Sequence, residues 1–198
     1  AQSYLELYQD PVVASNTATS DFLIRDLMNS ERPVSLYIIT QPTDKDRLRP
    51  LVRVMLNMMV RILAPKQEFE EGRVVQSYKH RALFMIDEFP SLGKLGIIQE
   101  SLAFAAGYGL KFYLICQDTN QLRSRETGYG PDELITSNAH IQNAYPPNRV
   151  ETAEHLSKLT GQTTVLKEQI TKSTGRGGGG FFGGTVSKTV QETQRPLL

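Results

Sequence analysis

The sequence predicts an α/β fold with a mostly parallel sheet, helices on both of its faces and a β-hairpin extension at the end. Apolar runs rich in β-branched and aromatic residues alternate with amphipathic stretches, as in parallel sheets joined by crossover helices. Most of these runs lack two-residue alternation, which fits strands buried on both faces. From residue 162 the composition changes to Thr, Lys and Gln around a glycine-rich segment, which favours a hairpin.

The first predicted strand spans residues 33–40, an apolar run opened by a proline. A turn follows, and apolar residues then repeat at helical spacing from Leu48 to Ile62, which predicts a long helix. Thr43 or Asp44 could cap this helix, and a proline ends it. A polar connection leads to the next strand.

The second predicted strand spans residues 82–87. A helix over 96–109 follows, and its glycine-rich end fits a left-handed C-cap. The third strand spans 110–117. Pro131 is placed to open a short helix, since its fixed φ suits a first turn, and residues 139–145 form a fourth, short strand.

The last third of the chain predicts a helix and then a hairpin. Residues 148–161 are amphipathic and end in a glycine, which indicates a helix with a defined C-terminus. Residues 162–198 read as two strands around a glycine-rich tip. The tip is not a phosphate-binding loop, because no GK[ST] follows and no strand-to-helix transition surrounds it.

The bulk composition is that of a globular domain. The 198 residues are 39% hydrophobic and 22% charged, with a net charge of +1. This balance gives no bulk nucleic-acid signature, although a local basic surface remains open. A single cysteine, Cys116, excludes an internal disulfide, and three dispersed histidines do not suggest a zinc site. No run reaches the roughly 18 consecutive apolar residues of a membrane helix.

Polar side chains end three of the four predicted strands. Asp87 and Glu88 end the second, Gln117 ends the third, and Thr40 and Gln41 end the first. Ligands of α/β parallel sheets bind beyond the carboxyl ends of the strands. Burying an ionised carboxylate without a partner costs much free energy. We therefore expect the two acids to have a cation or hydrogen-bond donors as partners.

An apolar strand that ends in Asp-Glu has the pattern of a Walker B element. In such a site Asp87 holds Mg²⁺ through water, and Glu88 polarises the water that attacks ATP. A solvated turn explains these two residues equally well. Gln117 favours the first interpretation, because a neutral donor and acceptor level with the carboxylates can sense a γ-phosphate and align water.

The phosphate-cradling element of such a site is absent from the sequence. No Walker A segment, GxxxxGK[ST], occurs in the 198 residues. We therefore expect it to precede Ala1 in a longer protein. The chain by itself is expected to supply the Mg²⁺ and water side of the site, to bind nucleotide poorly and to turn none over.

The blocks "PVSLYIITQPTDKDRLRPLVRVML" and "ALFMIDEFPSLGKLGIIQESLAFAAGYGLKFYLICQDTNQL" resemble the TraG-like type IV secretion coupling proteins, which are similar to other RecA-like ring motors that move DNA. The resemblance runs through most of the chain. It implies a RecA-like P-loop NTPase core without its Walker A segment. Residues 1–30 would re-enter from a missing helical domain, 31–161 would form a partial motor core, and 162–198 would be the hairpin extension.

The resemblance also implies roles for individual residues. Asp87 matches the Walker B aspartate that holds Mg²⁺ through water, Glu88 the adjacent catalytic glutamate, and Gln117 the glutamine of the following strand. All three would face ATP. The intact protein would form a ring at the cytoplasmic face of the bacterial inner membrane, with its anchor outside this chain. The resemblance implies that this ring has six subunits. It would engage DNA without sequence preference, together with relaxosome and secretion-channel proteins.

An arginine finger for the neighbouring subunit's site has several candidates. Some relatives carry a basic residue near the end of the helix after Walker B, where this chain has only Ala, Gly and Tyr at 105–108. A ring subunit can complete its neighbour's site with an arginine in trans. The candidates are Arg123, Arg125, Arg149 and Arg195, each of which also fits a surface or salt-bridge role.

A non-catalytic function stays open beside the motor. The chain could be a docking module for relaxosome or secretion-channel proteins, with Asp87 and Glu88 capping backbone or pairing with a basic side chain. If the sheet lacks part of its cover, apolar surface is exposed, and we expect self-association.

Overall fold

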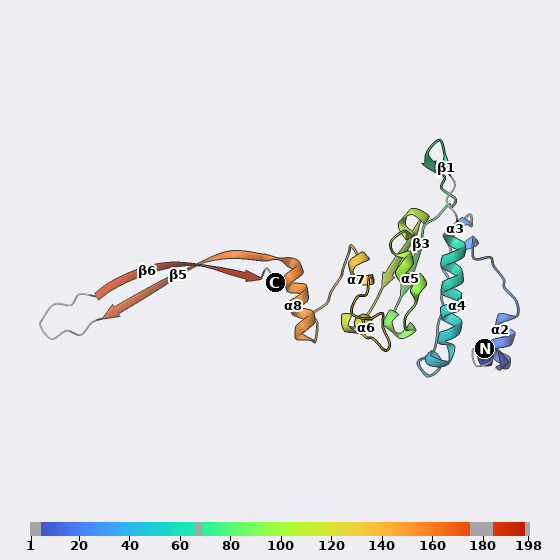
Figure 1. The fold of residues 1–198 in the computed structure, drawn as a ribbon, viewed down its shortest axis with the longest axis horizontal. Helices are drawn as coiled ribbons and strands as arrows, with labels where there is room; N and C mark the ends of the chain where they lie inside the picture. Colours follow the sequence, from blue (N-terminus) through green and yellow to red (C-terminus); the bar gives the residue numbers. More distant parts are fainter. Residues whose placement is uncertain (1–4, 66–68, 175–183, 197–198) are drawn as a thin grey trace, which may run out of the picture. The chain divides into compact units, whose positions relative to one another are not determined.

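The computed structural model describes residues 5–65, 69–174 and 184–196, and its contacts divide the chain into two compact units, Ala1–Gln142 and Asn143–Leu198 (Figure 1). The first unit holds one α/β core and the second a helix and a hairpin. Within the described ranges, no helix is both long enough and apolar enough to cross a membrane.

The first unit begins with short helices that lead to the long helix α4. Asp10 caps α2 by accepting hydrogen bonds from Val12 and Val13, and these bonds lower the pKa of its carboxyl group. The elements of this stretch are η1 (Glu6–Gln9), α2 (Pro11–Thr17), α3 (Asp26–Asn29), η2 (Pro42–Asp44) and α4 (Lys45–Leu63). The predicted long helix is therefore confirmed.

A parallel two-stranded sheet forms the centre of the first unit. Strand β3 (Ala82–Ile86) pairs with β4 (Leu110–Leu114) in a register that sets Ile86 opposite Leu114, as the α/β prediction requires. The other elements of this unit are β1 (Phe69–Glu70), β2 (Arg73–Val74), η3 (Phe89–Leu92), α5 (Gly96–Ser101), η4 (Ala105–Tyr108), α6 (Thr119–Arg123) and α7 (Ile135–Asn138). Strands β1 and β2 form a small antiparallel pair.

One face of this sheet packs on helices. Phe84, Ile86, Phe112 and Leu114 pack against a core whose buried members come from α4, η3, α5, α6 and α7 and from the loop positions Leu95 and Tyr129. Figure 1 shows α5 beside β3 and α4 next to them. Cys116 is partly buried against the same core, and burial raises the pKa of its thiol, which suits the predicted role as a small packing residue.

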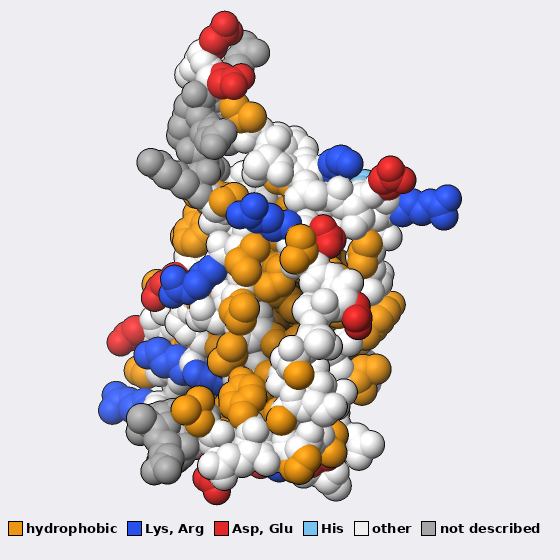
Figure 2. Space-filling view, turned by 90° about the vertical axis from the view of Figure 1, so that its right-hand side faces the viewer, with side chains coloured by type: hydrophobic (Ala, Val, Ile, Leu, Met, Phe, Trp, Pro, Cys, Tyr) orange, Lys and Arg blue, Asp and Glu red, His pale blue; other side chains and the backbone are white. Residues whose placement is uncertain are grey.

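The opposite face of the sheet is exposed in the described part of the chain. Burial alternates along both strands, and Leu83, Met85 and Tyr113 are 58%, 63% and 43% exposed. The sequence predicts helices on both faces, so this alternation differs from the expectation. Figure 2, which views the molecule from the right-hand side of Figure 1, shows a band of exposed hydrophobic side chains down the middle of that surface.

Two predicted strands and one predicted helix start are wrong. Residues 33–40 and 139–145 belong to no strand, and Ile39 and Tyr145 in them are 86% and 90% exposed. An apolar run becomes a strand only when a neighbour satisfies its backbone groups, and β3 and β4 pair with each other instead. Pro131 lies in a turn, and α7 begins only at Ile135.

The second unit contains α8 (Val150–Thr160) and a long antiparallel ribbon. Strand β5 (Gln162–Thr174) pairs with β6 (Gly184–Pro196) throughout, from Gln162 opposite Pro196 to Thr174 opposite Gly184. Helix α8 ends at Gly161, whose φ is 86°. The predicted glycine-rich tip falls mainly on residues 175–183, outside the described residues.

Candidate functional site

The two carboxylates lie in a tight turn at the carboxyl end of β3. Asp87 and Glu88 are both exposed, and Asp87 Oδ1 accepts the Glu88 N–H at 2.9 Å. Glu88 has a φ of 46°, in the left-handed region that non-glycine residues seldom occupy. Such a conformation costs on the order of 1–3 kcal/mol and persists only where the surroundings enforce it.

The residue after the turn anchors it to the core. The Phe89 N–H donates to the Ile115 carbonyl at 2.8 Å, and the Ile115 N–H donates to the Ile86 carbonyl at 3.0 Å. The Phe89 ring is 1% exposed and stacks on Tyr129 with centroids 5.8 Å apart. The turn at Asp87 and Glu88 is thus fixed both to the end of β4 and to the interior.

Tyr129 extends this support to the next loop. Its hydroxyl accepts the Leu95 N–H at 3.0 Å and donates to the Leu95 carbonyl at 3.4 Å. Burial raises the pKa of this hydroxyl to about 12, so it stays protonated at neutral pH. The same loop is held from α4 by Arg53, which donates to the carbonyls of Leu92 at 2.6 Å and Lys94 at 2.8 Å.

Gln117 follows β4 at the same edge of the sheet. Because β3 and β4 are parallel and level, their carboxyl ends lie together, as the sequence predicts. The Gln117 side chain is exposed, while its N–H donates to Gln121 Oε1 at 3.2 Å. Asp118 caps α6 and forms a capping box with Gln121. The D-x-x-Q spacing is a recognised helix-start signal that the sequence analysis missed.

Lys45 is a second residue that the sequence analysis missed. Its Nζ lies 3.1 Å from Glu88 Oε2, and the two side chains are 33% and 48% exposed. Lys45 is the first residue of α4, so this ion pair joins the helix to the turn. Spacing gives no signal for it, since the partners lie far apart in the sequence.

The four arginine candidates lie in different elements. Arg123 closes α6 with its Nε 4.0 Å from Glu133 Oε1, which fits the salt-bridge alternative. Arg125 is exposed in the loop that follows, and Arg149 is the N-cap residue of α8. Arg195 is paired with Thr163 in the ribbon of the second unit.

The carboxylate oxygens of the turn fit a hydrated metal ion that binds together with a nucleotide. Among the described residues, no group of three or more His, Cys, Asp or Glu side chains could hold a metal ion by itself. Asp87 uses Oδ1 for a backbone N–H, so Oδ2 is the oxygen that remains for a metal-bound water. Mg²⁺ commonly keeps several waters and binds through one or two carboxylates plus substrate phosphates.

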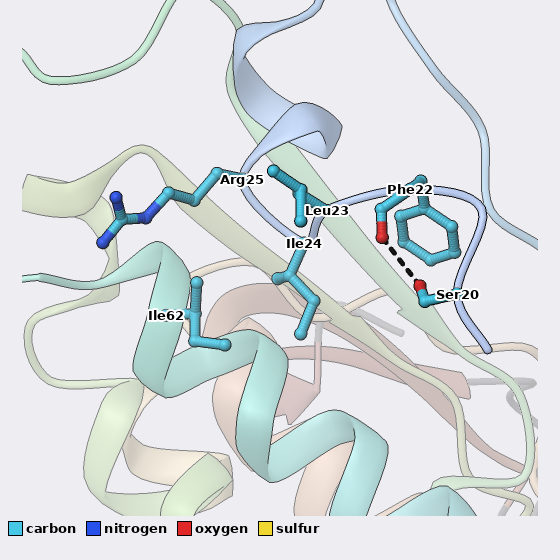
Figure 3. Close-up of a pocket in the computed structure, with 6 residues that line it drawn as sticks. All are labelled: Ser20, Phe22, Leu23, Ile24, Arg25 and Ile62. Carbon is cyan, nitrogen blue, oxygen red and sulfur yellow. Dashed lines mark hydrogen bonds between the residues drawn. The ribbon is translucent and has the colours of Figure 1, made fainter. Parts of the chain in front are cut away.

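A shallow pocket of about 490 Å³ lies elsewhere on the first unit. It is lined by Ser20, Phe22, Leu23, Ile24, Arg25 and Ile62 (Figure 3), and the Ser20 hydroxyl donates to the Phe22 carbonyl at 2.7 Å. Ile62 is near the end of α4, whereas Lys45 is at its start. None of the predicted site residues lines this pocket.

Comparison with known proteins identifies the family of the chain. The family model for type IV secretory system conjugative DNA transfer matches residues 1–198. The chain belongs to this family. It is 72% identical over its whole length to the conjugal transfer protein TraG of Escherichia coli, covering 31% of that relative. It is 31% identical to the protein VirD4 of Rhizobium radiobacter over 81% of the chain and 22% of that relative.

The resemblance to TraG-like coupling proteins is thereby confirmed. The match to the Escherichia coli relative runs through both units, including the ribbon of β5 and β6. The chain spans about a third of the length of that relative, 31%.

Proposed function

We propose that the chain is part of an ATP-driven coupling protein, which recruits DNA with its attached protein and pumps it into a type IV secretion channel during conjugation. The observation that carries this is the Asp-Glu pair at the carboxyl end of β3, beside the end of β4 that leads to Gln117. Ligands of parallel α/β sheets bind at that edge, and the chain is a member of a conjugative DNA transfer family.

Each residue at the edge has a chemical task under this proposal. Mg²⁺ bound with ATP would neutralise charge that develops on the phosphates. Asp87 would hold a water of that metal with its remaining oxygen, and Glu88 would take a proton from the attacking water. Gln117, with an exposed side chain, would donate a hydrogen bond toward the γ-phosphate.

The wider assembly is part of the same proposal. The protein would form a ring at the cytoplasmic face of the inner membrane, with its anchor outside this chain. The family resemblance suggests six subunits for this ring. It would hold DNA without sequence preference and contact relaxosome and channel proteins. Arg123, Arg125, Arg149 and Arg195 remain the candidates for a finger that completes the neighbour's site, and Arg123 has the Glu133 contact as a competing role.

The test uses a chimera in which this chain replaces the matching 31% of the Escherichia coli TraG relative. We expect the chimera to hydrolyse ATP and to support plasmid transfer. Asp87→Ala and Glu88→Gln should each lower the ATPase rate at least about 100-fold, the scale of general acid–base catalysis. Glu100→Gln, at an exposed position of α5, is the matched control and should leave both activities unchanged. ATP turnover by the 198-residue chain alone would contradict the proposed division of the site.

A second candidate function has an observation in its favour. Asp87 accepts a backbone N–H, and Glu88 pairs with Lys45, so both carboxylates have local partners without nucleotide. The chain could therefore be a non-catalytic docking module for relaxosome or secretion-channel proteins. Full ATP turnover in Asp87→Ala and Glu88→Gln would favour this candidate.

A further inference from the structure

The charged side chains at the start of α4 have separate partners. Arg47 binds Asp10 at 2.5 Å and Asp44 at 3.1 Å, and Arg49 binds Asp46 within the helix. The Lys45 ammonium lies instead 3.1 Å from Glu88 Oε2. The acidic residues of the helix start are thus engaged by arginines, and the lysine reaches across to the turn after β3.

Helix stability does not explain a lysine at this position. Lys45 is the first residue of α4, where the positive end of the helix dipole disfavours a cation and favours an acid. The Asp44 side chain makes no capping hydrogen bond there. Glu88 supplies the negative charge that offsets the misplaced ammonium, so the two groups are coupled.

Glu88 is also the strained residue of the turn, with a φ of 46°. The Phe89 N–H, the Asp87 carboxylate and the Glu88 carbonyl, which accepts the Ser91 N–H at 2.9 Å, hold its backbone. These contacts fix the backbone of Glu88 but do not restrict the rotamer of its side chain. The ion pair with Lys45 is the contact that the structure shows for the carboxylate itself.

We propose that Lys45 is a positioning residue that holds the Glu88 carboxylate away from the attacking water in part of the ATP-bound molecules as long as no DNA is bound. This inference rests on the proposed ATPase function. While Oε2 faces the ammonium, the ion pair holds the carboxylate toward the start of α4, although Oε1 keeps lone pairs that can accept a proton. Glu88 reaches the attacking water only after the carboxylate turns away from Lys45, and the ammonium is then free to face phosphate oxygens.

Both side chains are partly exposed, at 33% and 48%, so the restraint is weak and easily broken. Exposed ion pairs contribute little to stability, and a small contribution is what a reversible restraint requires. The pair can therefore exchange partners when a polyanion arrives without unfolding α4 or the turn.

The test uses the TraG chimera with Lys45→Met, Lys45→Arg and Lys111→Met. Lys111 lies exposed on β4 and is the matched control. Lys45→Met should raise kcat for ATP in the absence of DNA by about two- to fivefold, the range an exposed ion pair allows, with KM unchanged. Lys45→Arg should restore the original rate, and Glu88→Gln added to Lys45→Met should abolish the increase.

A readout without turnover accompanies the kinetics. In the 198-residue chain, the ¹³C resonance of the Glu88 carboxyl should shift in Lys45→Met but not in Lys111→Met. An unchanged or lower kcat in Lys45→Met, with an active chimera that Asp87→Ala inactivates, overturns the restraint and leaves the proposed function intact. An unshifted Glu88 resonance overturns the pairing itself. If the Asp87 and Glu88 variants all keep their ATPase activity, the proposed function itself is overturned.

Discussion

At the scale of single residues, Tyr129 links the stability of the core to the geometry of the turn at Asp87 and Glu88. Its ring stacks on Phe89, and its hydroxyl accepts the Leu95 N–H. Tyr129→Phe keeps the ring but leaves that buried N–H without its acceptor. Such a loss costs on the order of 1–3 kcal/mol, and we expect the free energy of unfolding measured in urea at about pH 8 to fall by this amount.

The same residue predicts a pH dependence. Burial raises the pKa of Tyr129 to about 12, above the ordinary value of about 10 in an unfolded chain. The unfolded state therefore releases this proton first, and the stabilisation is complete below about pH 10 and lost as the pH rises toward 12. The difference between the wild type and Tyr129→Phe should narrow at about pH 11. Tyr113→Phe, at an exposed ring, is the control, and a difference that stays constant with pH would contradict the argument.

Residue type and strand position were sufficient to predict the sheet edge. Asp87, Glu88 and Gln117 follow strands that do pair in parallel and level with each other, although their roles in chemistry stay predictions. Lys45 could not be predicted in the same way, because its contact with Glu88 depends on how α4 packs beside the sheet. The left-handed backbone of Glu88 was also hidden, since glutamate carries no signal for positive φ.

At the scale of elements, α6 and the turn after it depend on a glycine. A Cβ on Gly128 would lie 2.4 Å from the Gln121 carbonyl oxygen and 2.5 Å from that of Leu122. These are backbone atoms of α6, so Gly128→Ala has to displace the helix or the turn. Overpacking of this kind costs typically about 1–3 kcal/mol.

The expected result is a lower midpoint of urea unfolding in Gly128→Ala, together with amide chemical-shift changes from Gln117 to Gln121 in the folded chain. Gly96→Ala is the matched control, because its Cβ would meet only Glu100 Oε1 at an ordinary 3.6 Å. Alanine at this first position of α5 should be neutral or stabilising by up to about 1 kcal/mol. A Gly128→Ala chain as stable as the wild type would show that the turn relaxes without cost.

Elements with their own local signals were predicted better than those that need a distant partner. The period of α4 and the apolar runs of β3 and β4 each contain enough information, and all three elements are present. Residues 33–40 have the same composition as a strand, but a strand also needs a neighbour for its backbone groups. Sequence pattern identifies the apolar segment and not the partner, which is why this element and 139–145 were wrong.

At the scale of the whole molecule, the chain consists of two units that are stabilised in different ways. The first has a buried core around α4, α5 and the sheet. The second is built from α8 and a two-stranded ribbon, and isolated two-stranded hairpins are marginally stable in water. The sequence predicted a parallel α/β sheet, a helix over 148–161 and a hairpin after it.

The exposed face of the parallel sheet should determine how the chain behaves in solution. Leu83, Met85 and Tyr113 lie on it with 58%, 63% and 43% of their surface exposed, and contiguous apolar surface of this kind favours association. We expect the 198-residue chain to self-associate, with an apparent mass in sedimentation equilibrium that rises with concentration. Leu83→Thr combined with Met85→Thr should weaken association at least about tenfold, because the apolar area that drives it is removed.

The matched control replaces two exposed leucines that lie outside the sheet. Leu5 and Leu134 are 61% and 52% exposed, so Leu5→Thr with Leu134→Thr removes a similar apolar area from scattered positions. Threonine suits a strand, so the changes at Leu83 and Met85 should leave β3 folded, and circular dichroism checks this. Equal effects of both pairs would assign association to general hydrophobicity. A monodisperse wild-type monomer at high concentration would show that the sheet face is inert, because apolar side chains of this area gain too little from mutual burial to offset the entropy of association.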